Sequence, residues 1–326
     1  MGPDREPTTH FAGVPLAHDR LVPSHSGDSE LDVNRSPEQI CGADSRLKSK
    51  PDVGIDLRRS ALERPLLMGI INVTPDSFHD GGLYALPEMA VTQGRRLLEE
   101  GADILDVGGE STRPGAAPVL ESVESERVIP VVRALAGRGA VVSIDSRHPS
   151  VVVAALKAGA RIVNDITGLN DREMRRIVRE SGAYAVIMHM QGEPGDMQDA
   201  PHYDDCLGEV HDWLATRVAL CEAEGIARGR IAIDPGIGFG KSLEHNLALL
   251  KGLRKFTEIG CPLLLGVSRK SFIAHLCGGI PSQERLPGSL AAALWGATQG
   301  AQILRVHDVA ETAQALRIWQ AASQRG

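Results

Sequence analysis

The stretches LLMGIIN (66–72) and ADILDVG (102–108) decide the fold, because each is a short and almost unbroken aliphatic run. Such runs are typical of strands buried on both faces of a parallel sheet. Six more follow along the chain: VVSID (141–145), RIVND (161–165), YAVIMHM (184–190), RIAIDPG (230–236), PLLLGVS (262–268) and AQILRVH (301–307). Stretches with apolar residues at three- and four-residue spacing lie between the runs and predict helices. Eight strands that alternate with helices predict an α/β protein, a (β/α)8 TIM barrel.

A doubly wound open sheet is the alternative, since a single strand–helix unit has the same pattern in both architectures. Eight units favour closure into a barrel. No G-x-G-x-x-G follows the first run, which argues against a dinucleotide-binding fold. Aromatic residues make up only 3% of the chain, so branched aliphatic side chains must fill the core, as they do inside parallel barrels.

Composition also limits the partners. The net charge is −7 and no cluster of Lys and Arg stands out, which argues against nucleic acid. No stretch of about 18 apolar residues is present, and the first residues do not resemble a signal peptide, so we expect no membrane association. The five cysteines show no CxxC spacing, which argues against a disulfide framework and structural zinc and is typical of the reducing cytoplasm.

Residues 1–60 differ from the rest, as PSHSGDSELDVNRSPEQ (23–39) illustrates. The segment is rich in Pro, Ser, Asp, Arg and His and cannot bury enough apolar surface to offset the entropy lost on ordering. We therefore predict a disordered N-terminal extension (1–60) followed by the barrel domain (61–326). A small binding extension is the alternative.

Polar side chains follow the aliphatic runs at their carboxyl ends, where a parallel barrel gathers its active-site residues. A lone Asp after a strand often caps the next helix, but a polar residue after every run indicates a site. The series is Asn72, Asp106 with Glu110, Asp145, Asn164 with Asp165, His189, Asp234, Ser268 to Lys270, and Arg305 with His307.

The chemistry of these residues predicts a substrate class. Arg269, Lys270, Arg305 and His307 follow the last two runs, where barrels frequently bind phosphate. Carboxylates and amides, as at Asp145, suit a heterocycle with several N–H groups and ring acceptors. The Gly- and Pro-rich loops at 72–82, 108–116 and 234–241 can approach a ligand closely. The residues thus predict a phosphorylated, nitrogen-rich ring and leave the reaction open.

Eight motifs resemble, in order, those of bacterial dihydropteroate synthases. They span Met68 to Val309: MGIINVTPDSFHDGG, GADILDVGGESTRPGA, SIDSRHP, NDITG, MHMQGEPGDMQ, DPGIGFGK, GVSRKSF and LRVHDV. The resemblance implies a TIM barrel that condenses (7,8-dihydropterin-6-yl)methyl diphosphate with p-aminobenzoate, giving 7,8-dihydropteroate and diphosphate for folate synthesis. It also implies a homodimer, small-molecule substrates and Mg²⁺ as cofactor.

The resemblance assigns roles to individual residues. For the pterin ring it implies Asp145, Asn164, Met188, Asp234, Phe239, Lys270 and Arg305. For the diphosphate it implies Asn72, which would also ligate Mg²⁺, with Thr112, Arg305 and His307. For p-aminobenzoate it implies Phe78, Thr112, Pro114 and Ser271. Asp76, Asp80 and Arg113 would order the closed loops, and the catalytic set would be Asp145, Arg305, His307, Asp76 and Arg113.

The implied mechanism begins with loss of diphosphate, which leaves a cation delocalised over the pterin, and the aromatic amine then attacks. Asp145 would stabilise the cation, while loop closure would keep water away. His79 departs from the family pattern, which has a small residue there. Sensitivity to sulfonamides stays open.

Three other functions are considered. A pterin-dependent methyltransferase domain shares the barrel and the acidic pocket but needs no diphosphate site, and the Arg305–His307 pair argues against it. A non-catalytic paralogue would bind pterin without turnover. A Schiff-base aldolase using Lys270 would need a desolvating apolar pocket, of which the neighbouring Arg269 gives no sign.

Overall fold

The computed structural model describes residues 56–57, 64–74, 86–111 and 115–323. Within them lies an eight-stranded parallel barrel, which confirms the predicted fold class. The strands are β1 (Leu66–Asn72), β2 (Ile104–Gly108), β3 (Val142–Asp145), β4 (Ile162–Asp165), β5 (Tyr184–Met188), β6 (Ile231–Asp234), β7 (Leu264–Leu265) and β8 (Ile303–Val306). Every strand coincides with one of the aliphatic runs, although β7 is much shorter than its run.

The strands follow the order β6-β5-β4-β3-β2-β1-β8-β7, with parallel neighbours throughout. The two edges meet between β6 and β7, where a parallel bridge joins Ile233 to Leu263. The Ile233 amide donates a hydrogen bond of 2.9 Å to the carbonyl oxygen of Pro262. The barrel therefore closes at a seam that consists of one isolated bridge, beside a β7–β8 ladder of only two residue pairs.

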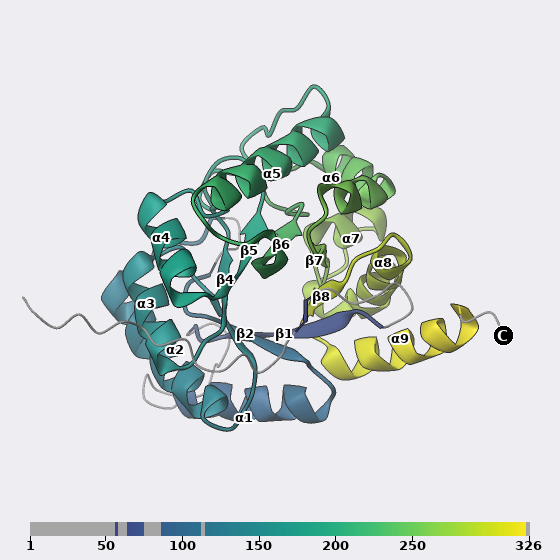
Figure 1. The fold of residues 1–326 in the computed structure, drawn as a ribbon. Helices are drawn as coiled ribbons and strands as arrows, with labels where there is room; N and C mark the ends of the chain where they lie inside the picture. The colour runs from purple at the N-terminus through teal and green to yellow at the C-terminus, as the bar shows by residue number, and fades with distance from the viewer. Residues whose placement is uncertain (1–55, 58–63, 75–85, 112–114, 324–326) are drawn as a thin grey trace, which may run out of the picture. The chain divides into compact units, whose positions relative to one another are not determined.

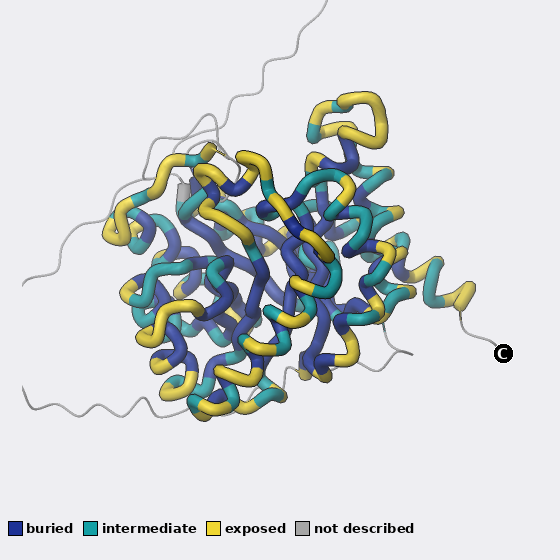
Figure 2. Tube along the Cα trace, turned by 90° about the horizontal axis from the view of Figure 1, so that it is seen from above, coloured by how far each residue is buried: buried dark blue, intermediate teal, exposed yellow. Residues whose placement is uncertain are grey.

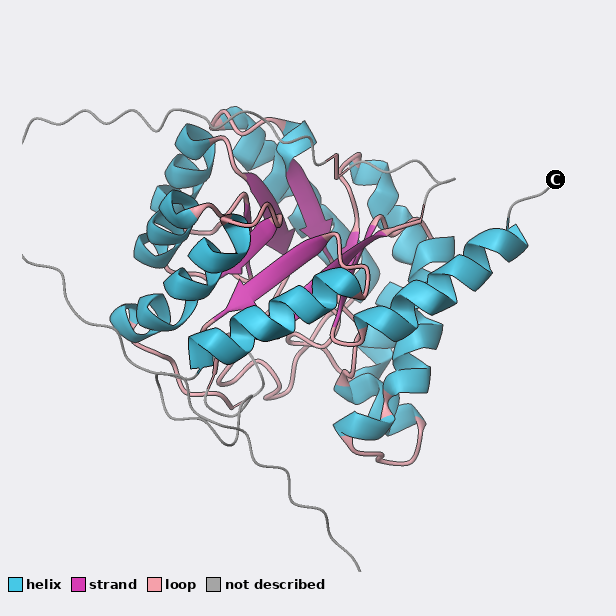
Figure 3. Ribbon diagram, turned by 90° about the horizontal axis from the view of Figure 1, so that it is seen from below, coloured by secondary structure: helices cyan, strands magenta, loops and turns pink. Residues whose placement is uncertain are grey.

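Helices surround the strands in Figures 1 and 3, with the strands in the middle of both views. In the described ranges they are α1 (Leu86–Glu99), α2 (Glu121–Ala136), α3 (Pro149–Ala158), α4 (Arg172–Ser181), α5 (Cys206–Ala223), α6 (Leu243–Lys251), α7 (Ser271–Leu276), α8 (Leu286–Thr298) and α9 (Val309–Ser323), with 3₁₀ turns at Arg228–Arg230, Leu253–Ile259 and Ser282–Glu284. None of these helices combines the length and the apolar composition that a membrane crossing requires.

Local sequence sets where these helices begin and end. The Asp171 carboxylate accepts a hydrogen bond from the Glu173 amide and so caps α4. Gly182, with φ of 66°, then turns the chain toward β5. Left-handed backbone of this kind costs glycine no steric penalty, which is why a glycine ends the helix.

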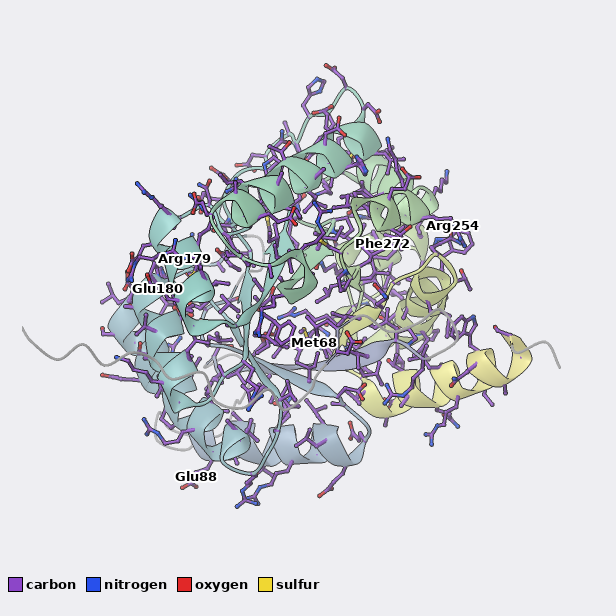
Figure 4. All side chains as sticks on the ribbon, in the orientation of Figure 1. Met68, Glu88, Arg179, Glu180, Arg254 and Phe272 are labelled. Atoms are coloured by element: carbon purple, nitrogen blue, oxygen red, sulfur yellow. The ribbon has the colours of Figure 1, made fainter. Side chains whose placement is uncertain are left out.

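Apolar side chains form two buried clusters, and Figure 2 shows buried residues in the centre of the fold and exposed residues toward its outside. The larger cluster fills the space between the sheet and the helices. The smaller one lies inside the barrel and consists of Leu57, Leu66, Met68, Ile104, Ile162, Val186, Ala232, Leu264 and Ile303. Figure 4 shows Met68 inside the ring of helices and Glu88 and Glu180 at its outer edge.

Strand alternation determines which residues share the interior with this inner cluster. Side chains two residues apart on a strand face the same side, so the positions after the inner cluster also point inward. On β2, β4 and β6 those positions are Asp106, Asn164 and Asp234. The barrel interior is therefore apolar at the amino end of the strands and polar at the carboxyl end.

The expected boundary near residue 60 and almost all of the extension lie outside the described residues. Leu57 is described, is 1% exposed and belongs to the inner cluster. Its burial shows that apolar contacts of the barrel begin a few residues before the expected boundary.

Candidate active site

One row of side chains crosses four neighbouring strands at the carboxyl end of the barrel. Asn72 pairs in register with Gly108, Gly108 with Asp145, and Asp145 with Asn164. A Cβ at Gly108 would lie 3.4 Å from the Asp145 Cβ, so glycine leaves room around this carboxylate. Three of the predicted site residues thus share one level.

Arg305 reaches this row from below. It lies on β8 in register with Met68, four residues before Asn72 on β1. Its Nε donates to Oδ2 of Asp106 and its Nη2 to Oδ2 of Asp145, both at 2.6 Å. Asn164 Nδ2 donates to the same Asp106 oxygen at 3.0 Å. Two carboxylates therefore fix the guanidinium before any ligand arrives, and Nη1 forms no hydrogen bond to the described residues.

Burial dominates the electrostatics of this group. It raises the pKa of Asp145 to about 7, although the Arg305 guanidinium acts in the opposite direction. It also raises the pKa of Asp234, against the effect of the Lys270 ammonium. These shifts arise because charged forms are costly in a site with little water. A cationic ligand group beside the carboxylates would favour their ionised forms.

Asp234 and Lys270 form a second group of charged side chains near Arg305. The Lys270 ammonium donates to the carbonyl oxygen of Ile237 and lies 4.3 Å from the centre of the Phe239 ring. A Cβ placed on Gly266 would lie 3.8 Å from Asp234 Oδ2, 3.9 Å from Arg305 Cβ and 4.0 Å from Lys270 Nζ. Asp234, Lys270 and Arg305 thus surround Gly266, the residue that directly follows β7. Because Gly266 has no side chain, the space between the three residues stays open.

His307 and Ser271 lie at the rim of the pocket. His307 Nδ1 is 3.0 Å from the Ser268 hydroxyl, and the His307 amide donates to the same oxygen at 3.2 Å. Ser271 is the exposed first residue of α7. Arg269 adopts left-handed backbone, with φ of 60°, and its carbonyl accepts a hydrogen bond from Arg285. This turn points Lys270 toward the barrel interior.

The donor set at Asn72 fits a magnesium ion. Asn72 ends β1, is half-buried, and its side chain forms no hydrogen bond to the described residues. A free amide oxygen is the hard ligand that Mg²⁺ accepts, and this ion keeps several waters or phosphate oxygens besides one or two protein ligands. The residues present therefore match a cation held mainly by its diphosphate partner.

The prediction that every polar residue after a strand joins the pocket is wrong at three positions. His189 follows the inward-facing Met188 and so faces the helices, where its ring centre lies 5.0 Å from that of Trp213. Asp165 accepts from the Thr167 and Leu169 amides at 2.8 and 3.0 Å and therefore caps its own loop. Arg269 forms an ion pair with Asp308.

Several predicted residues lie outside the described ranges, so their roles stay predictions. They are Asp76, Phe78, His79, Asp80, Thr112, Arg113 and Pro114. Conversely, Asp106 belongs to the predicted series of polar residues but was given no substrate role, although it is fully buried and binds both Arg305 and Asn164. Asp106 lies two residues after Ile104 and on the same face of β2, and this spacing identifies it as an inward-facing residue.

A closed parallel barrel whose strand ends carry clustered acids, an amide and cations defines the class: an enzyme of the TIM-barrel type with a site for an anionic, nitrogen-rich substrate. The sequence profile of the family described as pterin binding enzymes matches residues 68–307. The dihydropteroate synthase of Escherichia coli K12 is 49% identical over 261 residues, which cover 80% of this chain and 92% of that protein.

Solved structures agree. Dihydropteroate synthase of Xanthomonas albilineans with 4-aminobenzoic acid has a TM-score of 0.77 and 47% identity, covering 81% of this chain and 95% of that one. The enzyme from the same organism in complex with 7,8-dihydropteroate has a TM-score of 0.74 and 44% identity, covering 81% and 96%. The chain therefore belongs to the pterin-binding enzyme family, among the dihydropteroate synthases.

Proposed function

We propose that the chain is a transferase that condenses (7,8-dihydropterin-6-yl)methyl diphosphate with p-aminobenzoate, giving 7,8-dihydropteroate and diphosphate in folate biosynthesis. The observation that carries this proposal is Arg305 held between Asp106 and Asp145, beside Asp234 and Lys270, in one pocket. The relatives named dihydropteroate synthase, and the solved complexes with 4-aminobenzoic acid and 7,8-dihydropteroate, support the choice of both substrates.

The pterin ring binds between the two sides of the pocket. Asp234 accepts from the ring N–H and the exocyclic amine through a carboxylate that can take two parallel hydrogen bonds. Asp145, Asn164 and Lys270 contact the ring edges, and Met188 and Phe239 line its faces. Lys270 already lies over Phe239, so the ring enters a site whose cation is preformed.

The reaction exchanges one bond at the pterin methylene carbon. Its C–O bond to the diphosphate breaks, the electron pair leaves with the diphosphate, and the positive charge spreads over the pterin. The amine of p-aminobenzoate then forms the new C–N bond and releases a proton. Asp145, together with the adjacent Asp106, stabilises the cation, while Arg305 and His307 contact the departing diphosphate.

Arg305 can contact both the pterin-side carboxylates and the departing diphosphate, because its guanidinium nitrogens have different partners. Nε and Nη2 are committed to carboxylates, whereas Nη1 can donate to a diphosphate oxygen. A preorganised donor costs no reorganisation when charge develops on the leaving group. Asn72 would hold Mg²⁺ together with diphosphate oxygens, and Thr112 would contact the diphosphate. When bound, the ion would neutralise charge on the leaving group.

The p-aminobenzoate site is assigned to Phe78, Thr112, Pro114 and Ser271, with Asp76, Asp80 and Arg113 ordering the loops. Support comes from where these loops start: the first follows Asn72 and the second follows Gly108, which are paired in register. Asp76 and Arg113 complete the catalytic set by closing the site against water, which would otherwise capture the cation.

We further propose that the enzyme is a cytoplasmic homodimer that acts on small molecules and not on nucleic acid or membranes. In the described part of the chain, Cys206, Cys221 and Cys277 form no disulfide, which is compatible with a reducing compartment. Leu276 on α7 and Trp295 on α8 are 56% and 46% exposed, and apolar surface of this kind suits a contact between copies. Analytical ultracentrifugation tests the dimer.

The deciding experiment mixes the purified chain with the pterin diphosphate, p-aminobenzoate and Mg²⁺, and follows dihydropteroate by chromatography and diphosphate by a coupled assay. We expect equimolar products that require both substrates and disappear with EDTA. Pterin binding without product would instead identify a non-catalytic paralogue. Product formation that is unaffected by EDTA would contradict the role of Mg²⁺.

A further inference from the structure

Lys241 is a buried amine that the proposed chemistry does not use. The residue is 2% exposed, and it forms no ion pair with any described carboxylate. Its Nζ instead lies 2.9 Å from the carbonyl oxygen of Phe239, 3.3 Å from that of His189 and 3.0 Å from His189 Nδ1. Burying an amine is costly unless its hydrogen bonds are satisfied, and here three partners surround it.

These partners join two segments that are far apart in sequence. The loop at 235–240 follows β6 and crosses directly over the carboxyl end of β5. A Cβ at Gly236 would collide with the His189 carbonyl oxygen, and one at Gly240 with that of Gln191. Both glycines have left-handed backbone, with φ of 68° and 59°, so this loop conformation requires glycine.

Side-chain donors hydrogen-bond five successive carbonyl oxygens, from Ile237 in the loop to Lys241 just after it. The pairs are Ile237 with Lys270, Gly238 with Gln198, Phe239 with Lys241, Gly240 with Tyr203, and Lys241 with Asn246. Two residues of this set also contact His189 at the end of β5. Lys241 hydrogen-bonds its carbonyl oxygen and lies 3.0 Å from its Nδ1, whereas Tyr203 makes a ring contact with centres 6.1 Å apart. Among these side chains, Lys241 is therefore the one with hydrogen bonds to both segments, and it holds the Phe239 carbonyl at a fixed distance from the end of β5.

The position of the loop matters because both of its ends meet the pterin pocket. Asp234 precedes the loop, and its Oδ1 accepts from the Gly236 amide at 2.7 Å. Phe239 lies near its far end, with the Lys270 ammonium 4.3 Å from its ring centre. A shift of the Phe239 backbone would move the ring and the Lys270 cation together.

We infer that Lys241 is a positioning residue for pterin binding: by tying the Phe239 carbonyl to the end of β5, its amine sets the distance between Phe239, Lys270 and Asp234. This inference rests on the proposed function, because it names which of the two substrates the residue serves. Lys241 does not touch the reacting atoms and takes no part in the chemical step.

Lys241 can hydrogen-bond Phe239 and His189 in either protonation state of its amine. As an ammonium, Lys241 donates to both carbonyls and to Nδ1. As a neutral amine it donates to the carbonyls and accepts from Nδ1–H, which needs only the other imidazole tautomer. Burial lowers the pKa of Lys241 to about 7 and that of His189 to about 3, so a neutral imidazole is present throughout the physiological range. The role of Lys241 is therefore tested by comparing KM for the pterin diphosphate with KM for p-aminobenzoate, and not by a pH profile.

Lys241→Met tests the inference by keeping the length of the side chain and removing its donors. We expect KM for the pterin diphosphate to rise about tenfold or more, which corresponds to roughly one lost hydrogen bond. The turnover number and KM for p-aminobenzoate should stay within about twofold. Lys251→Met, at the exposed end of α6, is the matched control and should leave all three unchanged.

A second variant and a binding measurement complete the test. Lys241→Gln retains an amide donor and should restore part of the pterin affinity; it also replaces Lys241→Met if that variant fails to fold. Calorimetric titration of the pterin diphosphate into each variant gives the dissociation constant without turnover. A wild-type enzyme that forms product, together with Lys241 variants of unchanged pterin affinity, overturns the inference and leaves the proposed function standing. A wild-type chain that binds the pterin diphosphate without forming product contradicts the proposed function, while the titrations still decide the role of Lys241.

Discussion

The two ends of the barrel interior are built on the same strands and have opposite chemistry. At the amino end, Met68, Ile104 and Ile303 belong to an inner cluster that is entirely apolar and fully buried. Two residues further along β2 and β8, Asp106 and Arg305 form an ion pair of 2.6 Å. One step of the strand alternation thus separates a hydrophobic core from a charged pocket.

This difference shows how a rigid site can be built from costly groups. Buried charges destabilise a fold unless partners compensate them, and here Arg305 on β8 pairs with Asp106 on β2 and with Asp145 on β3. The apolar layer below supplies favourable burial and holds the strands in register. The amino end should therefore govern stability, and the carboxyl end should govern turnover.

Arg305→Ala should cause the largest loss of turnover, a factor between about 100 and 1000 in kcat/KM for the pterin diphosphate. The change removes the donor to the leaving group and leaves Asp106 and Asp145 without their shared cation. Steady-state kinetics measure it, with Arg96→Ala on the exposed face of α1 as the control. Turnover like that of the wild type would reject the role of Arg305.

Asp145→Asn should lower kcat about a hundredfold, because an amide cannot offset the cation that forms on the pterin. The pKa of Asp145 is raised to about 7, so the carboxylate is present above that pH and becomes protonated below it. Wild-type kcat/KM should therefore fall up to about tenfold for each unit below pH 7, whereas that of the variant should be flatter. Parallel slopes in the two proteins would assign the pH dependence to another group.

Met68→Ala should have the smallest effect on turnover, within about twofold, because the side chain lies below the pocket. Its effect on stability should be large: deletion of a fully buried Met from a packed core costs about 2–5 kcal/mol of unfolding free energy. Denaturant unfolding with and without the pterin diphosphate measures the loss. A large drop in kcat with unchanged stability would break the proposed division between the two ends.

Much of this division follows from the sequence. Strands buried on both faces need continuous aliphatic runs, and all eight runs lie on strands. The pocket was harder to predict, because the end of a strand presents residues to both faces. His189 and Asp165 lie as close to the ends of their strands as Asp145 and Asn164 do, yet alternation directs them toward the helices.

Other features depend on barrel closure. Arg305 and Asp106 are 199 residues apart, and their contact exists only because β1, β2 and β8 are neighbours in one register. The same holds for Lys241 and His189, whose meeting requires the β6 loop to cross the end of β5. Sequence spacing contains no information on such pairs until the strand order is known.

The seam between β6 and β7 has a consequence for ligand binding. Asp234 ends the strand on one side of this junction, and Lys270 follows the strand on the other. A molecule that contacts both therefore links β6 to β7, which are joined by a single isolated bridge. Occupancy of the pocket should then slow hydrogen exchange at the Ile233 amide more than at amides between β2 and β3. Equal slowing at both places would show that bound substrate does not reinforce the closure of the barrel.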